Sequence, residues 1–189
     1  QPQIDIQTNK IIGVEALLRW KNPLLGYVFP DEFITISEQT GLIIPLGAFV
    51  LTQSMVLSAQ WQKTHDINFR MAVNLSPRQF RDPNLVSSIE HAINKSGISV
   101  NSLELEITEG VLMIGHTYIN DAITDLAKLG IELSMDDFGT GYSSLSYLRN
   151  YPFSILKIDR SFINDVTTAP ADKALVKATI SMAHSLGLK

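Results

Sequence analysis

Hydrophobic and polar residues alternate in several short stretches, and this alternation predicts strands. These stretches are rich in β-branched and aromatic residues and are bounded by turn residues. They are Ile4–Gln7, Ile11–Trp20, Phe69–Leu75, Leu103–Ile107, Ile131–Met135 and Ser154–Ile158. Between them the apolar spacing becomes helical, as in residues 116–130, where one face collects Ile119, Ala122, Ile123, Leu126 and Leu129. Further helices are expected at Asp31–Thr40, Leu46–Lys63, Leu85–Ser96 and from Pro170 to Gly187.

After an opening pair of strands, strands and helices alternate, which is typical of a parallel α/β fold. An open doubly wound sheet and a closed barrel both fit this order. Polar residues end several different strands, and this favours the barrel, because an open sheet gathers its ligand groups at one switch point. A complete eight-fold barrel takes about 250 residues. We therefore expect a TIM-like (β/α)8 barrel whose C-terminal strands are missing from this chain of 189 residues.

Composition narrows the function classes. Hydrophobic residues make up 45% of the chain and charged residues 18%, which suits one globular domain. A net charge of -4 argues against non-specific DNA binding. The absence of cysteine excludes disulfides and thiolate chemistry, and it fits a reducing cytoplasm. The longest apolar run, Gly41–Leu51, is too short to span a bilayer, so no membrane segment is expected. The start without Met suggests a chain excised from a longer protein.

Oxygen-bearing side chains close several of the predicted strands. Glu15 shares a strand face with Arg19, and Lys157 shares one with Asp159. The oxygen donors at the strand ends are Glu15, Asn74, Glu106 and Asp136. A sulfur-free set of oxygen donors suits hard cations such as Mg²⁺, Mn²⁺ or Ca²⁺.

Asp136 and Asp137 are adjacent acids at the end of a predicted strand. Like charges in contact repel unless a cation lies between them. Asp137 would let one carboxylate bridge to a second ion, and two ions about 3.5–4 Å apart can clamp a phosphoryl group. Lys157 is a candidate for holding a phosphate oxygen or a water, and Arg19 for a phosphate or a base edge.

Each residue also has a simpler interpretation. Glu104 is expected on a solvated strand face. Asn74 could cap the turn into the next helix, and Lys157 could belong to a structural ion pair. The sequence "DDFGTG" could be only a turn, and Ser144 replaces the third glycine of a dinucleotide-binding fingerprint.

Five motifs together resemble those of the EAL-domain phosphodiesterases, which hydrolyse bacterial cyclic di-GMP. In order they are "VEALLRW", "NLSPRQF", "ELEITEG", "DDFGTGYSSLSYL" and "LKIDRSFI", and the name-giving triplet is Glu15-Ala16-Leu17. The resemblance covers Gln1 to Lys189, so residues 1–189 are expected to be one EAL phosphodiesterase domain, truncated at its C-terminus. It implies a modified (β/α)8 barrel whose first strand is antiparallel to the rest.

The resemblance also implies roles for individual residues. Ligands of one Mg²⁺ or Mn²⁺ would be Glu15, Asn74, Glu106 and Asp136. Asp136 would bridge to a second ion that Asp137 also binds. Lys157 would position the attacking water or stabilise the transition state, and Asp159 would support the site. The dinucleotide would contact Gln1, Leu17 and Arg19. Glu109 would anchor the "DFGTGYSSL" loop, which the family links to dimerisation.

The expected activity is metal-dependent opening of cyclic di-GMP to linear pGpG. In the family, a Val-Ala-Glu-Gly-Val-Glu-type motif with the general base would follow Lys189, so the 189-residue chain alone is expected to be inactive although its parent domain is competent. One alternative is a non-catalytic cyclic di-GMP receptor. Another is an unrelated barrel enzyme that uses Lys157 as a Schiff-base lysine. A homodimer, fused to sensor or GGDEF-type domains in the bacterial cytoplasm, is the expected context.

Overall fold

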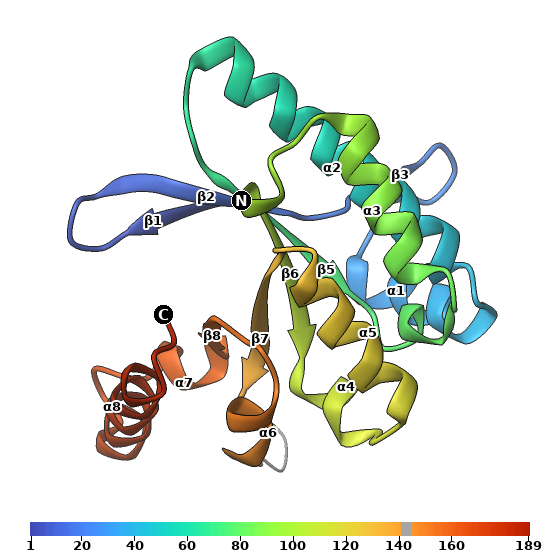
Figure 1. Ribbon diagram of the computed structural model, residues 1–189. Helices are drawn as coiled ribbons and strands as arrows, with labels where there is room; N and C mark the ends of the chain where they lie inside the picture. Colours follow the sequence, from blue (N-terminus) through green and yellow to red (C-terminus); the bar gives the residue numbers. More distant parts are fainter. Residues whose placement is uncertain (141–144) are drawn as a thin grey trace.

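The computed structural model describes residues 1–140 and 145–189, and its centre is a curled six-stranded sheet (Figure 1). The strand order is β1-β2-β5-β6-β7-β8, with β1 antiparallel to β2 and each later pair parallel. The strands are β1 (Pro2–Asp5), β2 (Lys10–Ala16), β5 (Arg70–Leu75), β6 (Leu103–Thr108), β7 (Glu132–Phe138) and β8 (Ile155–Ile158). The sheet forms a half-barrel, which confirms the predicted α/β barrel class and its antiparallel first strand.

Helices cover the outer face of the sheet (Figure 1). They are α1 (Pro30–Thr40), α2 (Ile43–His65), α3 (Leu85–Ser96), α4 (Glu109–Met113), α5 (Thr117–Lys128), α6 (Leu145–Asn150), α7 (Arg160–Asn164) and α8 (Pro170–Ser185). Two 3₁₀ turns, η1 (Gln79–Arg81) and η2 (Val100–Ser102), flank α3. The predicted long helices are thus confirmed, and the short α4, α6 and α7 were missed because a helix of one or two turns carries little periodicity.

The hydrophobic core lies between the central strands and the helix layer. Alternate residues of β5 and β7 face outwards, so Met71, Val73 and Leu133 are buried there. The predicted apolar face of α5 meets them, with Ile119 and Ile123 buried. Each such side chain contributes about 1.5–3 kcal/mol by burial. The outward rows therefore hold the sheet in place, and the inward rows are left for polar side chains.

The segment predicted as one strand, Ile11–Trp20, divides after Ala16, so that prediction was wrong. Beyond the break a separate hairpin forms from β3 (Trp20–Asn22) and β4 (Gly26–Val28). The Asn22 side-chain oxygen accepts hydrogen bonds from the backbone nitrogens of Leu24 and Leu25 at 2.8 and 3.1 Å. This Asx-type turn reverses the chain. The dipeptide Asn22-Pro23 was the sequence signal for it.

Helix α2 is longer than the apolar run singled out in the sequence. Over its 23 residues it is long and apolar enough to cross a membrane by length and composition. The core helix of a water-soluble domain passes the same test, and α2 packs against β5 and α3 through buried Leu51 and Met55. Its contacts identify it as a covering helix of the sheet.

Candidate active site

The carboxyl ends of the strands bring together the predicted site residues around the Lys157 ammonium. Its Nζ atom lies 2.6 Å from Glu106 Oε2 and 3.2 Å from Asp136 Oδ2. Glu15 Oε2 is 4.0 Å away, and Asn74 Nδ2 donates to Glu15 Oε1 at 2.9 Å. These residues come from β2, β5, β6, β7 and β8, as a barrel-type site requires. The predicted convergence of strand ends is therefore present in the structure.

Glu106 is the most buried member of the cluster, with 0% exposure. Its Oε1 atom has no hydrogen-bond partner among the residues that the structure describes. Burial raises the pKa of Glu106 to about 8; Lys157 opposes this rise, and the charges of Glu15 and Asp136 add to it. A buried carboxylate oxygen without a partner is costly in free energy. Glu106 Oε1 is therefore the atom of this cluster that a further cation would stabilise.

For Lys157, the neighbouring charges outweigh burial in setting the pKa, whereas for Glu106 burial outweighs them. Burial works to lower the pKa of Lys157, but the hydrogen bond and charge of Glu106, with Asp136 and Glu15, raise it above its ordinary value. The lysine therefore stays protonated at neutral pH and serves as a counter-ion to the acids around it.

A bulge in β7 places Asp136 and Asp137 together. Met135 pairs with Leu156 and Phe138 with Ile158, so β7 has one residue more than β8 in this stretch. Asp137 takes a left-handed conformation with φ 56°, and its backbone nitrogen donates to Asp136 Oδ1 at 2.9 Å. Burial raises the pKa of Asp137, and the nearby carboxylates of Asp136 and Asp159 raise it further. Consecutive residues of a regular strand would point to opposite faces.

Asp159 caps α7 as well as lying near this cluster. Its Oδ1 atom accepts from the Ser161 backbone nitrogen at 2.9 Å and from the Ser161 hydroxyl. The side-chain hydrogen bond from Ser161 lowers the pKa of Asp159, so the carboxylate remains charged. These contacts fix Asp159 at the start of α7, and its supporting role in catalysis stays a prediction.

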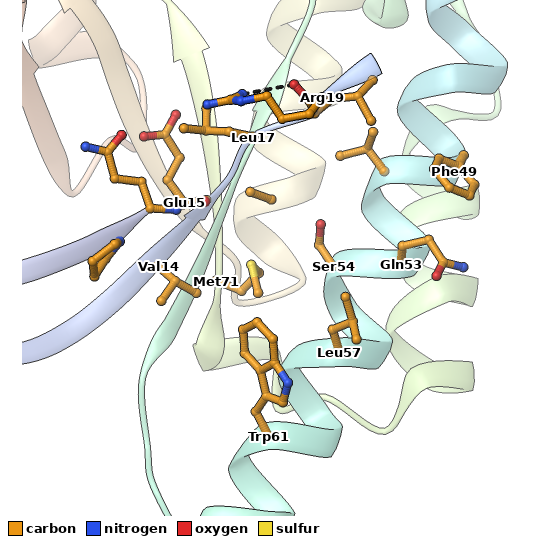
Figure 2. A pocket seen from close by; sticks show the side chains of 15 residues that line it. Val14, Glu15, Leu17, Arg19, Phe49, Gln53, Ser54, Leu57, Trp61 and Met71 are labelled. Carbon is orange, nitrogen blue, oxygen red and sulfur yellow. Dashed lines mark hydrogen bonds between the residues drawn. The ribbon is translucent and has the colours of Figure 1, made fainter. Parts of the chain in front are cut away.

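The residues expected to contact a dinucleotide line a cavity of about 780 Å³ between β2 and α2 (Figure 2). They are Gln1, Leu17 and Arg19. The backbones of Gln1 and Glu15 pair through two hydrogen bonds of 2.7 Å. Leu17 and Arg19 also line a cavity of about 440 Å³ that contains Asn74 and Asp137, which joins them to the acid cluster. Their contact with substrate stays a prediction.

The prediction that Glu15 and Arg19 lie on one face of the same strand was wrong. Strand β2 ends at Ala16, so strand parity does not reach Arg19. The guanidinium is exposed and donates to the Leu18 carbonyl oxygen at 2.9 Å (Figure 2). Figure 2 also shows the Glu15 carboxylate pointing away from Val14 and Trp61. Arg19 reaches the cavity from an irregular segment.

Glu109 begins α4 directly after β6 and is buried. The loop it was expected to anchor contains residues 141–144, which lie outside the described residues. Its anchoring role therefore stays a prediction. The four histidines, His65, His91, His116 and His184, lie exposed on helices or loops.

Glu104 was expected on a solvated face, and this was wrong, because β6 lies at the centre of the sheet and Glu104 is only 1% exposed. Burial raises the pKa of Glu104, with Ser134 and Arg70 opposing the rise. Arg70 Nη1 lies 3.6 Å from Glu104 Oε2 and 2.8 Å from Glu132 Oε2. Lys189 Nζ lies 3.0 Å from Glu132 Oε1. A second charged layer therefore lies below the first.

Arg70 and Glu132 were not selected from the sequence. Their signal was available, because "FRMAVN" and "IELSMD" place a charged residue on the same face as the strand-end residue. Burial works to raise the pKa of Glu132, but the hydrogen bonds from Arg70 and Lys189 lower it below its usual range. Lys189 is held beside β8 by backbone hydrogen bonds of 2.9 Å to Ser154 and Leu156.

The donor set fits a hard divalent cation. Carboxylate and amide oxygens converge at the strand ends, and the partnerless Glu106 Oε1 is an oxygen that a cation would satisfy. In the described part of the chain, no three acidic or imidazole side chains group closely enough to hold an ion as they stand. The Lys157 ammonium lies among these acids, 2.6 Å from Glu106 Oε2 and 3.2 Å from Asp136 Oδ2.

The sheet is a half-barrel, and a polar cluster lies at the carboxyl ends of its parallel strands. These two features place the protein in the class of barrel-type α/β domains. The EAL domain family matches residues 1–189, and the chain belongs to that family.

Curated relatives cover the whole chain. It is 38% identical to "Cyclic di-GMP phosphodiesterase PA2567" of Pseudomonas aeruginosa, across 100% of this chain and 32% of that protein. It is 34% identical to "Cyclic di-GMP phosphodiesterase PdeR" of Escherichia coli, across 100% of this chain and 28% of that protein. The chain thus spans about a third or less of the length of such relatives.

Solved structures share the fold closely. The structure described as "PaMucR Phosphodiesterase, c-di-GMP complex" superposes with a TM-score of 0.94 at 39% identity, covering 100% of this chain and 76% of that one. The EAL enzyme Bd1971, in its cAMP and cyclic-di-GMP bound form, superposes with a TM-score of 0.95 at 36% identity, covering 100% of this chain and 52% of that one. Both likenesses support the barrel assignment.

Proposed function

We propose that this EAL domain hydrolyses cyclic di-GMP to linear pGpG with the help of Mg²⁺ or Mn²⁺. The observation that carries the proposal is the cluster of oxygen donors around Lys157 at the strand ends. The named activity of PA2567 and PdeR supports the same substrate.

The first ion would be held by Glu15, Asn74, Glu106 and Asp136. Asp136 and Asp137 would hold the second, because the β7 bulge brings these neighbours together. Divalent ions in such a site neutralise phosphate charge and lower the pKa of a bound water. The buried Glu106 would supply its ionised form on binding, since the cation compensates for its desolvation.

Lys157 would donate a hydrogen bond to a phosphate oxygen or to the attacking water. Its raised pKa keeps the ammonium charged, and its place between Glu106 and Asp136 fixes its direction. A positive charge that is already oriented towards the place where negative charge develops lowers the activation barrier of a phosphoryl-transfer reaction. Lys157 would be oriented in this way. The same charged state argues against a Schiff-base lysine, which must be neutral to attack a carbonyl.

Arg19 and Leu17 would bind a guanine of the substrate in the cavity of about 440 Å³. An arginine matches the O6 and N7 acceptors of guanine in a bidentate pair, and Leu17 offers an apolar surface beside it. Among the described residues, the Arg19 guanidinium donates only to the adjacent Leu18 carbonyl oxygen, so it is available to turn towards a ligand.

A non-catalytic receptor for cyclic di-GMP is the second candidate. The presence of all five expected donors, Glu15, Asn74, Glu106, Asp136 and Asp137, favours catalysis, because a receptor needs no buried Glu106 at the metal position. The test incubates the purified full-length parent protein with cyclic di-GMP and Mn²⁺, Mg²⁺ or EDTA, and separates the products by chromatography. Metal-dependent pGpG supports hydrolysis, and binding without turnover supports the receptor.

The variants Glu15→Gln and Asp136→Asn should abolish turnover, with Asp125→Asn at an exposed position of α5 as the matched control. Inactivity of the 189-residue chain alone stays a prediction, which the same assay tests directly. A homodimer, fusion to other signalling domains and a cytoplasmic location also stay predictions. Light scattering after size exclusion tests the first of them.

A further inference from the structure

A side-chain hydrogen bond of Glu38 connects helix α1 to Ser76, the residue that follows β5. The Ser76 hydroxyl donates to Glu38 Oε1 at 2.6 Å in a partly buried position. This contact joins residues 38 positions apart in the sequence. A hydroxyl bond to a charged carboxylate is stronger than a bond between neutral groups.

The loop that follows β5 is fixed around Ser76. The Arg78 backbone nitrogen donates to the Ser76 hydroxyl at 3.2 Å, and the Ser76 backbone nitrogen donates to Gln79 Oε1 at 3.0 Å. Gln79 is buried against Gly47 of α2, where an added Cβ would come within 2.1 Å of Gln79 Nε2. These contacts hold the loop in position between α1 and α2.

Asn74 lies two residues before Ser76, near the end of β5, and it pairs in register with Glu106 of β6. Its side chain is exposed and donates to Glu15 Oε1 at 2.9 Å. The direction of this exposed side chain is therefore set by its hydrogen bond to Glu15 and by the path of the backbone where β5 ends. Glu38, Asn74 and Ser76 line the same cavity of about 440 Å³.

We infer that Glu38 is a positioning residue for Asn74, acting through Ser76 to aim the Asn74 amide at the metal position. The inference rests on the proposed function for the presence of a metal, but not on the identity of the substrate. Residues that orient metal ligands in this indirect way change metal affinity by about 10–100-fold when removed.

The experiment measures Mn²⁺ affinity by calorimetry and, separately, kcat and KM for cyclic di-GMP. We expect Glu38→Ala and Ser76→Ala each to weaken Mn²⁺ binding by about 10-fold or more. The double variant should be no weaker than either single one, because both break one contact. Glu38→Gln keeps a carbonyl acceptor and should restore most of the affinity. At saturating Mn²⁺, KM should stay near that of the wild type.

Glu32→Ala is the matched control, since Glu32 is an exposed acid on the same helix outside the cavity. Wild-type Mn²⁺ affinity in Glu38→Ala would overturn the inference. A changed KM with unchanged Mn²⁺ affinity would also overturn it and would assign Glu38 to substrate contact. Equal loss in Glu38→Gln and Glu38→Ala would overturn the role of the Ser76 bond. A full-length wild-type protein that binds Mn²⁺ without cleaving cyclic di-GMP would refute the proposed function alone, and one that binds no Mn²⁺ would refute both.

Discussion

The Lys157 ammonium lies 2.6 Å from the Oε2 atom of Glu106, whose side chain is fully buried. The lysine thereby supplies the positive charge that the surrounding acids require in the absence of an ion. Removing one partner of a buried pair leaves the other uncompensated. The pair therefore connects the folding of the metal-free protein to the chemistry of its site.

Replacing Lys157 should separate binding from turnover. We expect Lys157→Met to lower kcat by about 100-fold or more, because a fixed positive donor is lost. Mn²⁺ should bind at least as tightly as in the wild type, because the ammonium no longer competes for Glu106 and Asp136. Calorimetry and product assays measure the two effects. Weaker Mn²⁺ binding would contradict this account, and Lys128→Met, at an exposed pair, is the control.

Stability of the metal-free protein should fall as pH rises from 6 to 8. The pKa of Glu106 is raised from 4.5 to about 8, so within that window the folded state holds a proton that the unfolded state has lost. Linkage then gives a loss of about 2 kcal/mol between pH 6 and 8. Lys157, whose pKa is raised above 10.5, adds stability that is lost only at higher pH. Urea unfolding in EDTA measures the slope.

The Glu106→Gln variant tests the source of that slope, because glutamine does not titrate. The pH dependence between 6 and 8 should largely disappear in this variant. A slope equal to that of the wild type would assign the effect to another group. Glu90→Gln, an exposed position on α3, should keep the wild-type slope.

Mn²⁺ should stabilise the folded protein, and its removal should not unfold it. Binding to the native state alone contributes about 2.7 kcal/mol when the ion is at 100 times its Kd. The protein should remain folded in EDTA, since Lys157 already offsets the acids. Thermal unfolding with Mn²⁺ and with EDTA gives the comparison. Asp136→Asn should lose the Mn²⁺-dependent rise in Tm, and a rise as large as that of the wild type would contradict the ligand assignment.

Arg70 should matter to stability more than an exposed cation. Arg70→Met would leave Glu104 buried without its nearest positive partner, at a cost of about 3–5 kcal/mol. Adding Glu104→Gln to that variant should recover part of the loss. Lys128→Met breaks an exposed pair with Asp125 and should cost less than about 1 kcal/mol. Chemical unfolding measures the free energy of unfolding of the three variants. Equal losses of stability in Arg70→Met and Lys128→Met would show that the charged layer around Arg70 is worth no more than an exposed ion pair.

The sequence alone was sufficient to predict that the residues at the strand ends lie close together. Parallel strands share one carboxyl edge, so residues such as Asn74 and Glu106, which pair in register, had to meet once the strands were recognised. The order of strands and helices likewise followed from the change between alternating and helical periods.

Other features depend on contacts that the pattern does not contain. The burial of Glu104 follows from the central place of β6, which a local alternation cannot reveal. The hairpin after Ala16 was missed because its apolar residues continue the pattern of β2. The closeness of Asp136 and Asp137 needs a bulge, and strand parity alone predicts the opposite.

That bulge makes the acid pair depend on chain length as well as on residue identity. A substitution can remove one carboxylate and leave the other in position. Deleting Asp136 or Asp137, the two residues between Met135 and Phe138, would restore the regular pleat of β7 and leave a single acid at the end of this strand. A transplanted Asp-Asp pair would therefore fail to hold both carboxylates together in any barrel whose strand lacks the extra residue.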